Sequence, residues 1–504
     1  MLLHEYLSRS ARLTPDKVAL VCGAARSTYK EIATAASSFA GFLVASGLRK
    51  GERVAIYIDS SPQTVIAIFG ALEAGGCIVV INPATQAERL GYILENCNAR
   101  FLVCSVEKRA QVQQASAACT AKPLLVWTGA GEEAEAGVAF SNVMQEARPS
   151  PHVRLIDNDL AGIVYTSGST GKPKGVTHLH RTFNTAVEAI AEYLENNAED
   201  VILGVLPLSS SYGLLQLLVT FWTGGRVVLE KGFGYPYEII KRIKEEKVTG
   251  LAGAPTIWAI ILRLEGLEKE DFSSLRYITN AAAAMPASFV PRLRKVFPAT
   301  KIFLMHGLTE CLRTTYLPPD EIETRTTSVG TGMRNIELWV EDADGVRLGP
   351  GHVGEMIVRG STLMVGYWND PEGTAKALIP GPMPGEKVLR TRDLFRMDEE
   401  GYFHFVARSD ELIKSRGEKV SPIEVEDVIY TLDAVNEVRV IGVPDTILGQ
   451  AIRAEIVLKE GRTVSAQEVK AHCRRFLEDF KVPGVVEFVA SLPKTQGGKI
   501  KRSA

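Results

Sequence analysis

The sequence predicts an α/β protein with a large N-terminal domain and a small C-terminal domain, and three observations support this. The chain has 504 residues, and at roughly 150 residues per domain this length suggests about three folding units. From about Arg53 to Leu304, short β-branched runs alternate with segments of helical period. After about Leu317, glycine-punctuated strands replace that alternation.

The alternating region predicts two parallel sheets covered by helices. The strands expected in these sheets are residues 53–58, 77–81, 101–104, 162–166, 227–230, 277–280 and 302–305. Helical stretches such as 62–76 and 86–97 separate them. The region is long enough for two such sheets.

The next region predicts antiparallel hairpins, because polar turns that contain glycine separate its strands. We expect a small, β-barrel-like subdomain over about 318–409, which closes a large domain of residues 1–409. The chain then returns to alternating helix and strand, and Pro422 lies near the start of this segment. Residues 410–504 are therefore expected to form a separate α+β domain.

Composition excludes several classes of protein. Hydrophobic residues make up 46% of the chain, so it has ample material for a core and is not a disordered or fibrous protein. The 57 Lys and Arg almost balance the 59 Asp and Glu. A broad basic face for nucleic acid is not expected.

Cysteine usage and the N-terminus indicate a cytoplasmic protein. The seven cysteines are scattered and form no C-x-x-C pair, so we expect reduced, mostly buried thiols. The N-terminus lacks the cationic start and long apolar run of a secretory signal. Residues 201–225 carry no charge and are long enough to span a bilayer. Pro207 and several serines and glycines favour a buried strand, loop and helix instead.

The strongest local signal is YTSGSTGKPKG, residues 165–175, directly after an apolar strand. Its glycines let the backbone approach an anion, its hydroxyls and amides donate hydrogen bonds, and its lysines balance charge. The spacing does not match a P-loop or the nucleophile elbow of the α/β-hydrolases. The segment therefore predicts a phosphate-binding loop of another kind.

Four further segments carry chemistry less specifically. His306-Gly307-Leu308-Thr309-Glu310 follows a predicted strand, where a carboxylate suits a magnesium ion and a hydroxyl suits a phosphate; a capped turn explains it equally well. The segments 391–393 and 408–410 flank the last hairpin, and Asp393 suits a ribose diol, although solvated hairpin charges explain them too. Near the C-terminus, Gly497-Gly498 would present Lys499 on an unusually free backbone. A solvated basic end is the usual alternative.

His178-x-His180 does not predict a metal site, because no further Cys or His lies near it with a recognised ligand spacing. We expect two partly exposed histidines at the start of a helix.

Taken in order, these segments resemble those of the acyl-adenylate-forming ligases, which include acyl-CoA synthetases, peptide-synthetase adenylation domains and firefly luciferase. The resemblance runs from about Thr14 to Lys501, and YTSGSTGKPKG and LPKTQGGKIKR are its most specific motifs. It implies that the large domain binds ATP and an acid. It also implies that the small domain is mobile and rotates between two half-reactions.

The resemblance also implies roles for individual residues. The loop over the β- and γ-phosphates would comprise Thr166, Ser167, Gly168, Ser169, Thr170, Gly171 and Lys174. Asn280, Ala281, Ala282, His306 and Gly307 would contact the adenine, and Asp393 and Arg408 the ribose. Thr309 would contact the α-phosphate, Glu310 would hold Mg²⁺ and Lys499 would be the adenylation lysine. Asp410 matches the hinge, Gly417 the thiol tunnel, and Ser210, Ser211, Tyr212 and Gly253 the acid pocket.

Two positions depart from the family pattern. His306 stands where tyrosine is common, and Ser210 stands where many acyl-CoA ligases carry histidine. Amino-acid-activating relatives place an aspartate in the acid pocket, and none lies between Val201 and Gly225. A small aliphatic or aromatic carboxylic acid is therefore expected, rather than a free α-amino acid.

The predicted function is an ATP- and Mg²⁺-dependent ligase that converts this acid to acyl-AMP and then transfers the acyl group to CoA. The nearest alternative delivers the acyl group to the phosphopantetheine arm of an acyl carrier protein, and a luciferase-like oxygenase is more distant. A non-catalytic nucleotide-binding scaffold is a further alternative. The combined presence of Lys499, Glu310 and Asp393 disfavours the scaffold, because binding alone does not require the distant lysine.

Overall fold

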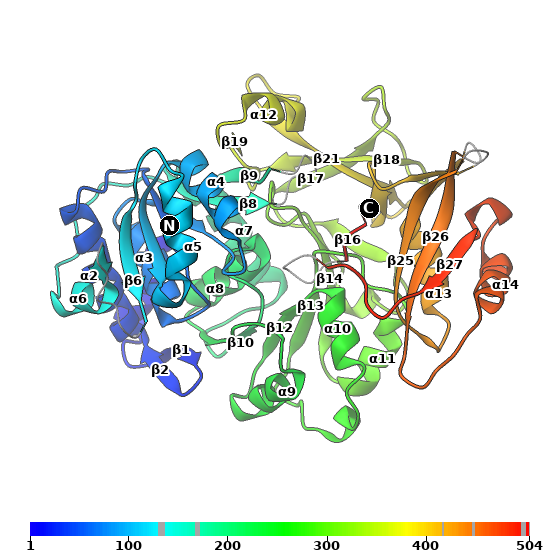
Figure 1. The fold of residues 1–504 in the computed structure, drawn as a ribbon, viewed down its shortest axis with the longest axis horizontal. Coiled ribbons are helices and arrows are strands. Elements are labelled where there is room, and N and C mark those ends of the chain that lie inside the picture. Colours follow the sequence, from blue (N-terminus) through cyan, green and yellow to red (C-terminus); the bar gives the residue numbers. More distant parts are fainter. Residues whose placement is uncertain (130–136, 167–171, 416–417, 446–448, 495–499, 503–504) are drawn as a thin grey trace.

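The computed structural model describes residues 1–129, 137–166, 172–415, 418–445, 449–494 and 500–502. Its strands form three sheets, and two large sheets make up the N-terminal part of the molecule (Figure 1). The predicted α/β architecture, with two helix-covered parallel sheets, an antiparallel β-rich part and a small C-terminal α+β part, is confirmed.

The first sheet has eight strands. In spatial order they are β19 (Gly366–Tyr367), β9 (Lys174–Leu179), β8 (Leu160–Thr166), β4 (Cys77–Val80), β3 (Arg53–Tyr57), β5 (Ala99–Ser105), β6 (Leu124–Thr128) and β7 (Val138–Ala139). The strands from β8 to β7 pair in parallel, and β9 and β19 continue the sheet antiparallel. The strands predicted over 53–166 all belong to this sheet.

The second sheet has fourteen strands and joins the second parallel sheet to the antiparallel region. In spatial order they are β17 (Ile336–Glu341), β18 (Val353–Gly360), β21 (Lys387–Met397), β22 (Phe403–Arg408), β16 (Ser328–Gly332), β15 (Thr315–Tyr316), β14 (Lys301–His306), β13 (Tyr277–Asn280), β12 (Gly250–Gly253), β10 (Val201–Gly204), β11 (Arg226–Leu229), β1 (Val18–Cys22) and β2 (Ala25–Thr28), with β20 (Leu378–Pro380) on β21. The antiparallel strands are thus hydrogen-bonded to the parallel ones through β15. This continuity fixes β21 and β22 relative to the carboxyl ends of β13 and β14.

Helices fill the space between the two large sheets and cover their outer faces. A shared layer between the sheets contains α1 (Leu3–Leu13), α2 (Tyr29–Ala45), α3 (Pro62–Glu73), α7 (His180–Tyr193) and α8 (Ser211–Thr223). The first sheet is covered outside by α4 (Ala87–Cys97) and α5 (Arg109–Ala117), and the second by α9 (Pro236–Glu245), α10 (Pro255–Ile261) and α11 (Phe289–Val296). The short helices α6 (Phe140–Gln145) and α12 (Pro371–Ala377) lie at the edges.

The stretch 201–225 forms β10, a loop and α8, as predicted. Ser210 caps α8, because its Oγ accepts a hydrogen bond from the Gly213 backbone nitrogen at 3.0 Å. The helix ends at Gly224, whose φ of 79° is the left-handed conformation that glycine adopts readily. Across the residues that the structure describes, no helix is both long and apolar enough to traverse a membrane.

The C-terminal part forms a five-stranded sheet with two helices. The sheet contains β24 (Glu418–Val420), β23 (Ile413–Ser415), β26 (Gly449–Leu458), β25 (Val435–Asp445) and β27 (Val485–Phe488), and its helices are α13 (Pro422–Tyr430) and α14 (Ala466–Phe476). A core of aliphatic side chains such as Val425, Val440 and Ile456 joins them. The seven cysteines are free thiols, six of them buried, as the sequence predicts.

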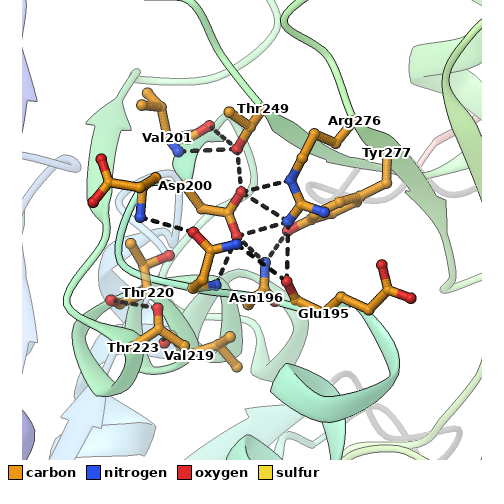
Figure 2. A network of polar contacts seen from close by, with 12 residues as sticks. Glu195, Asn196, Asp200, Val201, Val219, Thr220, Thr223, Thr249, Arg276 and Tyr277 are labelled. Atoms are coloured by element: carbon orange, nitrogen blue, oxygen red, sulfur yellow. Dashed lines mark hydrogen bonds and ion pairs between the residues drawn. The ribbon is translucent and has the colours of Figure 1, made fainter.

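A buried ion pair holds the amino ends of the second sheet, at the opposite end from the predicted ATP-binding residues. Figure 2 shows the Asp200 carboxylate facing the Arg276 guanidinium, with Asn196 and Thr249 beside it. Arg276 Nη2 lies 2.7 Å from Asp200 Oδ2, and Thr249 Oγ1 lies 2.7 Å from Asp200 Oδ1. Burial raises the pKa of Asp200, but the hydrogen bonds outweigh it, so the net shift is downward. The carboxylate therefore ties together β10, β12 and β13.

Asp200→Asn is expected to lower the free energy of unfolding by about 3 kcal/mol, because Arg276 loses its buried partner. Since the folded pKa of Asp200 is depressed, this contribution exists above the unfolded pKa and disappears as pH falls through the folded pKa. Denaturant unfolding at pH 7 and at a pH well below the unfolded pKa of ~4 measures it. Glu245→Gln, which affects an exposed pair with Lys241, serves as the control and should cost under ~1 kcal/mol. An equal effect of Asp200→Asn at both pH values would contradict this role.

Candidate active site

A cavity of about 960 Å³ opens at the carboxyl ends of the parallel strands. All three sheets contribute to its wall: Thr166 and Lys174 belong to the first sheet, Thr391 to the second and Ile413 to the third. This is the edge where open α/β sheets bind ligands. The structure therefore brings the β8–β9 segment, the loop after β14 and the C-terminal part to one cavity.

The loop after β14 is a tight turn that presents several predicted site residues. A Cβ on Gly307 would lie 2.6 Å from the Leu312 carbonyl oxygen, so only glycine allows this close backbone approach. The Thr314 backbone nitrogen donates to the His306 carbonyl at 3.0 Å and closes the loop. The turn presents His306 at its start and Thr309 and Glu310 at its tip, and all three line the site.

The second sheet places His306 beside the predicted ribose ligand. Asp393 on β21 pairs with Arg408 on β22, and its Oδ1 lies 3.2 Å from Arg408 Nη1. His306 Nε2 lies 3.1 Å from Asp393 Oδ2, and its Nδ1 lies 2.8 Å from Thr314 Oγ1. Burial lowers the pKa of Arg408, but the charges of Asp393 and Asp410 outweigh this effect. The net shift of the pKa is upward, so the guanidinium stays charged. His306, Asp393 and Arg408 thus form one polar chain.

Asp393 keeps one acceptor available for a ligand. Its side chain is buried, and its Oδ1 has an ion pair but no hydrogen bond with the described residues. A small cavity beside it has walls formed by Ala282, Phe405 and the edge of His306. An orphaned buried carboxylate oxygen next to apolar walls suits a ribose hydroxyl beside a flat base.

The predicted adenine-contacting segment is fixed by its own hydrogen bonds. Asn280 Oδ1 accepts from Trp258 Nε1 at 3.1 Å, and Asn280 Nδ2 donates to the Ala283 carbonyl at 3.0 Å. Ala282 adopts a φ of 73°, which costs on the order of 1 kcal/mol for a residue with a Cβ. Such strain gathers at binding sites. Ala281 and Ala282 both line the large cavity.

The part of the large cavity around Lys174 and Glu310 contains a tyrosine, Tyr367, that the sequence did not indicate. The hydroxyl of Tyr367 donates to Glu310 Oε1 at 2.7 Å, and Lys174 Nζ lies 4.8 Å from the centre of the Tyr367 ring. Lys174 also lies 3.8 Å from Asp370 Oδ2. Burial and the Glu310 charge raise the pKa of Tyr367 well above its usual value, so it remains a donor. Tyr367 lies between the segments 306–310 and 391–393, and no local pattern marks it.

The carboxylate of Glu310 suits Mg²⁺. It lines the cavity, and magnesium prefers oxygen ligands and keeps several waters and phosphate oxygens beside one or two carboxylates. Glu310 is therefore the residue that would hold the ion. In the described ranges, no three His, Cys, Asp or Glu side chains gather as ligands, so Glu310 would be assisted by water and phosphate oxygens.

His178 supports the tip of the loop, and the prediction of two partly exposed histidines is wrong. His178 lies on β9 with an inward side chain, and His180 begins α7; both are buried. His178 Nε2 donates to the Thr309 carbonyl at 2.8 Å, which joins the first sheet to the loop of the second. Burial lowers the pKa of His178 to about 4, although this hydrogen bond opposes the shift. His180 Nδ1 instead accepts from the Leu3 backbone nitrogen at 3.2 Å and anchors α1.

The predicted acid pocket is only partly assembled from the expected residues. Ser210, Ser211 and Tyr212 line the cavity, but the Ser210 hydroxyl is already bonded as the cap of α8 and to the Pro207 carbonyl. Gly253 does not reach the cavity. A Cβ there would lie 2.5 Å from the Trp258 ring, so packing accounts for this glycine.

Seven predicted residues, namely Ser167, Gly168, Ser169, Thr170, Gly171, Gly417 and Lys499, lie outside the described residues. For Lys499, the described residues on either side of it in the sequence show which part of the molecule this segment approaches. Lys494 and Ile500 form an antiparallel bridge on either side of it, and Ile500 lines the large cavity. Asp410, the predicted hinge, lies at the cavity wall with its Oδ1 3.5 Å from Arg408 Nε.

Comparison with known proteins identifies the family. Residues 7–368 match the family model of the AMP-binding enzymes, and residues 424–499 match the model of the AMP-binding enzyme C-terminal domain. The chain belongs to the AMP-binding enzymes. The predicted membership of the acyl-adenylate-forming ligases, and with it the prediction of an AMP-forming ligase, is thereby confirmed.

Similar members of the family include acyl-CoA ligases. The long-chain-fatty-acid–CoA ligase of Bacillus subtilis (strain 168) is 32% identical, over 99% of this chain and 93% of its own. A feruloyl-CoA synthase of Amycolatopsis sp. is 30% identical, over 98% and 96% of the two chains. The anthranilate CoA ligase AuaEII, solved in complex with anthranoyl-AMP, superimposes with a TM-score of 0.91 at 27% identity, over 99% of this chain and 95% of its own.

Asp393→Asn is expected to weaken ATP binding by roughly 10- to 100-fold, because a buried charged acceptor is lost while the shape is kept. Isothermal titration with ATP and Mg²⁺, in the absence of acid, measures this. Asp344→Asn changes an exposed aspartate in a distant turn and is the matched control. Unchanged ATP affinity in Asp393→Asn would rule out the ribose contact.

Proposed function

We propose that this AMP-binding enzyme activates an aliphatic or aromatic carboxylic acid with ATP and transfers the acyl group to CoA, releasing AMP and pyrophosphate. One observation carries the proposal. Two adjoining cavities, which share Ala282, Gly307 and Arg408 in their walls, place a recess at Asp393 next to a large cavity lined by Lys174, Glu310 and Tyr212. The C-terminal segment at Ile500 reaches the large cavity.

The first half-reaction requires charge stabilisation more than covalent catalysis. A carboxylate oxygen of the acid attacks the α-phosphorus of ATP, and the bond to the pyrophosphate oxygen breaks. Negative charge grows on the equatorial and leaving oxygens. We propose that Lys499 and the Thr309 hydroxyl donate to these oxygens, while Lys174 and the loop of residues 166–171 hold the β- and γ-phosphates.

We propose that the Glu310 carboxylate holds Mg²⁺, which when bound would neutralise phosphate charge. The residues of the chain orient the substrates around it. Tyr367 fixes the Glu310 carboxylate, and His178 fixes the backbone of Thr309. These contacts hold both side chains ready before ATP arrives, so little reorganisation is needed at the moment of reaction.

The second half-reaction requires a different arrangement of the same cavity. The thiol attacks the acyl carbon of the mixed anhydride, and AMP leaves. We propose that residues 410–504 rotate as a mobile domain about Asp410, which withdraws Lys499 and brings Gly417 to line the thiol tunnel. Separating the two steps in this way limits hydrolysis of the adenylate. The break between β22 and β23, with Asp410 inside it, supports this boundary.

The acid and the acceptor are the specific parts of the proposal. The acid pocket contains no aspartate between Val201 and Gly225 to pair with an ammonium group, and the named relatives act on long-chain fatty acids, ferulate and anthranilate. These observations favour an acid without an α-amino group. CoA is the proposed acceptor, in agreement with the same names, and a cytoplasmic location remains a prediction from the reduced cysteines.

Lys499→Ala is expected to lower acid-dependent ATP–pyrophosphate exchange by about 100-fold or more, by analogy with the loss of one transition-state donor. Lys494→Ala is the control from the same basic segment of the sequence, because Lys494 pairs with Glu437. A panel of aliphatic, aryl and amino acids supplies the substrates. Exchange that survives unchanged in Lys499→Ala would contradict the mechanism, and a wild-type protein that binds ATP but exchanges with no acid would support a scaffold.

The acceptor is tested separately. Enzyme, ATP and an active acid are incubated with CoA or with a carrier protein that carries phosphopantetheine, and the products are followed by mass spectrometry. We expect acyl-CoA to form in preference to acylated carrier. Exclusive acylation of the carrier would replace CoA with the alternative acceptor and leave the first half-reaction intact.

A further inference from the structure

Arg313 is a buried cation in the wall of the acid side of the cavity. Its exposed fraction is 2%, yet it lines the large cavity together with Ser211, Tyr212 and Thr309. The sequence analysis did not single it out, because it lies three residues beyond the predicted motif. Neither proposed half-reaction requires Arg313.

The charge of Arg313 lacks an anionic partner. Its Nε is buried without a hydrogen bond, and no carboxylate oxygen of the described residues lies within 4.0 Å of its guanidinium. Comparable arginines are paired: Arg439 lies 2.5 Å from Glu455, and Arg502 lies 2.5 Å from Glu426. Arginine cannot lose its proton in a protein, so burial without a counter-charge is costly.

The neighbours of Arg313 are aromatic rather than acidic. Its Cζ lies 5.1 Å from the centre of the Tyr212 ring, a cation–π contact that holds the guanidinium in place. Tyr212 is fixed in turn, because its hydroxyl lies 2.6 Å from Thr279 Oγ1. Burial raises the pKa of Tyr193, and the charge of Arg313 opposes that rise. These rings orient the cation without neutralising it.

The nearest carboxylates of the site are already engaged. Glu310 accepts from Tyr367, and Asp393 contacts both His306 and Arg408. They serve the phosphate and ribose sides of the cavity. Neither carboxylate is therefore available as the counter-ion of Arg313.

The backbone is strained where it presents Arg313. Leu312 adopts a φ of 61°, in the left-handed region that is a genuine outlier for a bulky side chain. The Arg313 Cα lies 3.0 Å from the position of a Cβ on Gly307, so the turn is tightly closed. Such strain persists only where the surroundings enforce it, and it clusters at ligand sites.

We propose that Arg313 binds a second carboxylate of the acid, so that the preferred substrates are dicarboxylic acids. This inference rests on the proposed function. One carboxylate would meet the α-phosphate of ATP beside Thr309, and the other would pair with the Arg313 guanidinium over Tyr212. The planar guanidinium suits a bidentate carboxylate, and such charge-assisted pairs are stronger than neutral hydrogen bonds.

The test compares acids in matched pairs by ATP–pyrophosphate exchange. Hexanoate is paired with adipate, and benzoate with benzene-1,3-dicarboxylate, in the wild type and in Arg313→Met and Arg313→Lys. In the wild type, kcat/KM should favour the dicarboxylate of at least one pair by roughly 10- to 100-fold. Arg313→Met should abolish that preference, mostly through KM. It should change kcat/KM for the monocarboxylate far less than for the dicarboxylate, and Arg313→Lys should restore part of the preference.

Arg334→Met is the matched control, because Arg334 is half exposed and pairs with Glu192 on the surface; it should retain the wild-type preference. Melting curves and ATP titrations show whether each variant is folded and binds nucleotide. Exchange with monocarboxylates at equal or higher efficiency in the wild type would overturn the inference and leave the proposed function standing. No exchange with any acid would contradict both. A preference that survives in a folded Arg313→Met would overturn the role of Arg313.

Discussion

The close approach of the backbone at Gly307 is the constraint on which the site depends. With no Cβ at this position, residues 306–314 fold back on themselves at the carboxyl end of β14. His306 then faces the Asp393 of β21, Glu310 faces Tyr367, and Arg313 lies against Tyr212. One loop therefore reaches the proposed ribose, phosphate and acid sides of the site. A side chain at this position would displace all three together, because the Leu312 carbonyl would have to move.

Strained backbone and unpaired polar groups occur together at the site, although neither is confined to it. Left-handed backbone occurs at Ala282, Leu312 and Arg392, which border the cavities. Asp393 keeps an oxygen without a hydrogen bond among the described residues. At the other end of the second sheet, by contrast, the Asp200 carboxylate is fully paired. The amino ends of the strands in the second sheet are held by a paired carboxylate, whereas polar groups at their carboxyl ends lack hydrogen-bond partners. This agrees with a site that completes its interactions only when ligands bind.

Much of the fold and part of the site followed from local patterns, whereas the rest depended on long-range contacts. Alternating β-branched runs predicted the strands, because each run is short and bounded by turns or helices. The hairpin pattern placed Asp393 and Arg408 on neighbouring strands, and their direct pairing agrees with it. The burial of His178 could not be predicted, because its partner, the Thr309 carbonyl, lies 131 residues away. Tyr367 and Arg313 also lacked a local signal in the sequence. Tyr367 lies in the first sheet and contacts Glu310 in the loop of the second. Arg313 stands out only because no carboxylate of the described residues pairs with it in the folded protein.

The central claim is that a lysine near the end of the chain helps to join an acid to AMP over the Asp393 ribose site. The most direct measurement is a crystal structure of the enzyme with a non-hydrolysable acyl-adenylate, such as an acyl-sulfamoyl adenosine. The account predicts the ribose hydroxyls on Asp393 and the Lys499 ammonium within hydrogen-bond reach of the group that replaces the phosphate. A ribose bound elsewhere, or a Lys499 in solvent with no conformer of the C-terminal domain that brings it closer, would contradict the account.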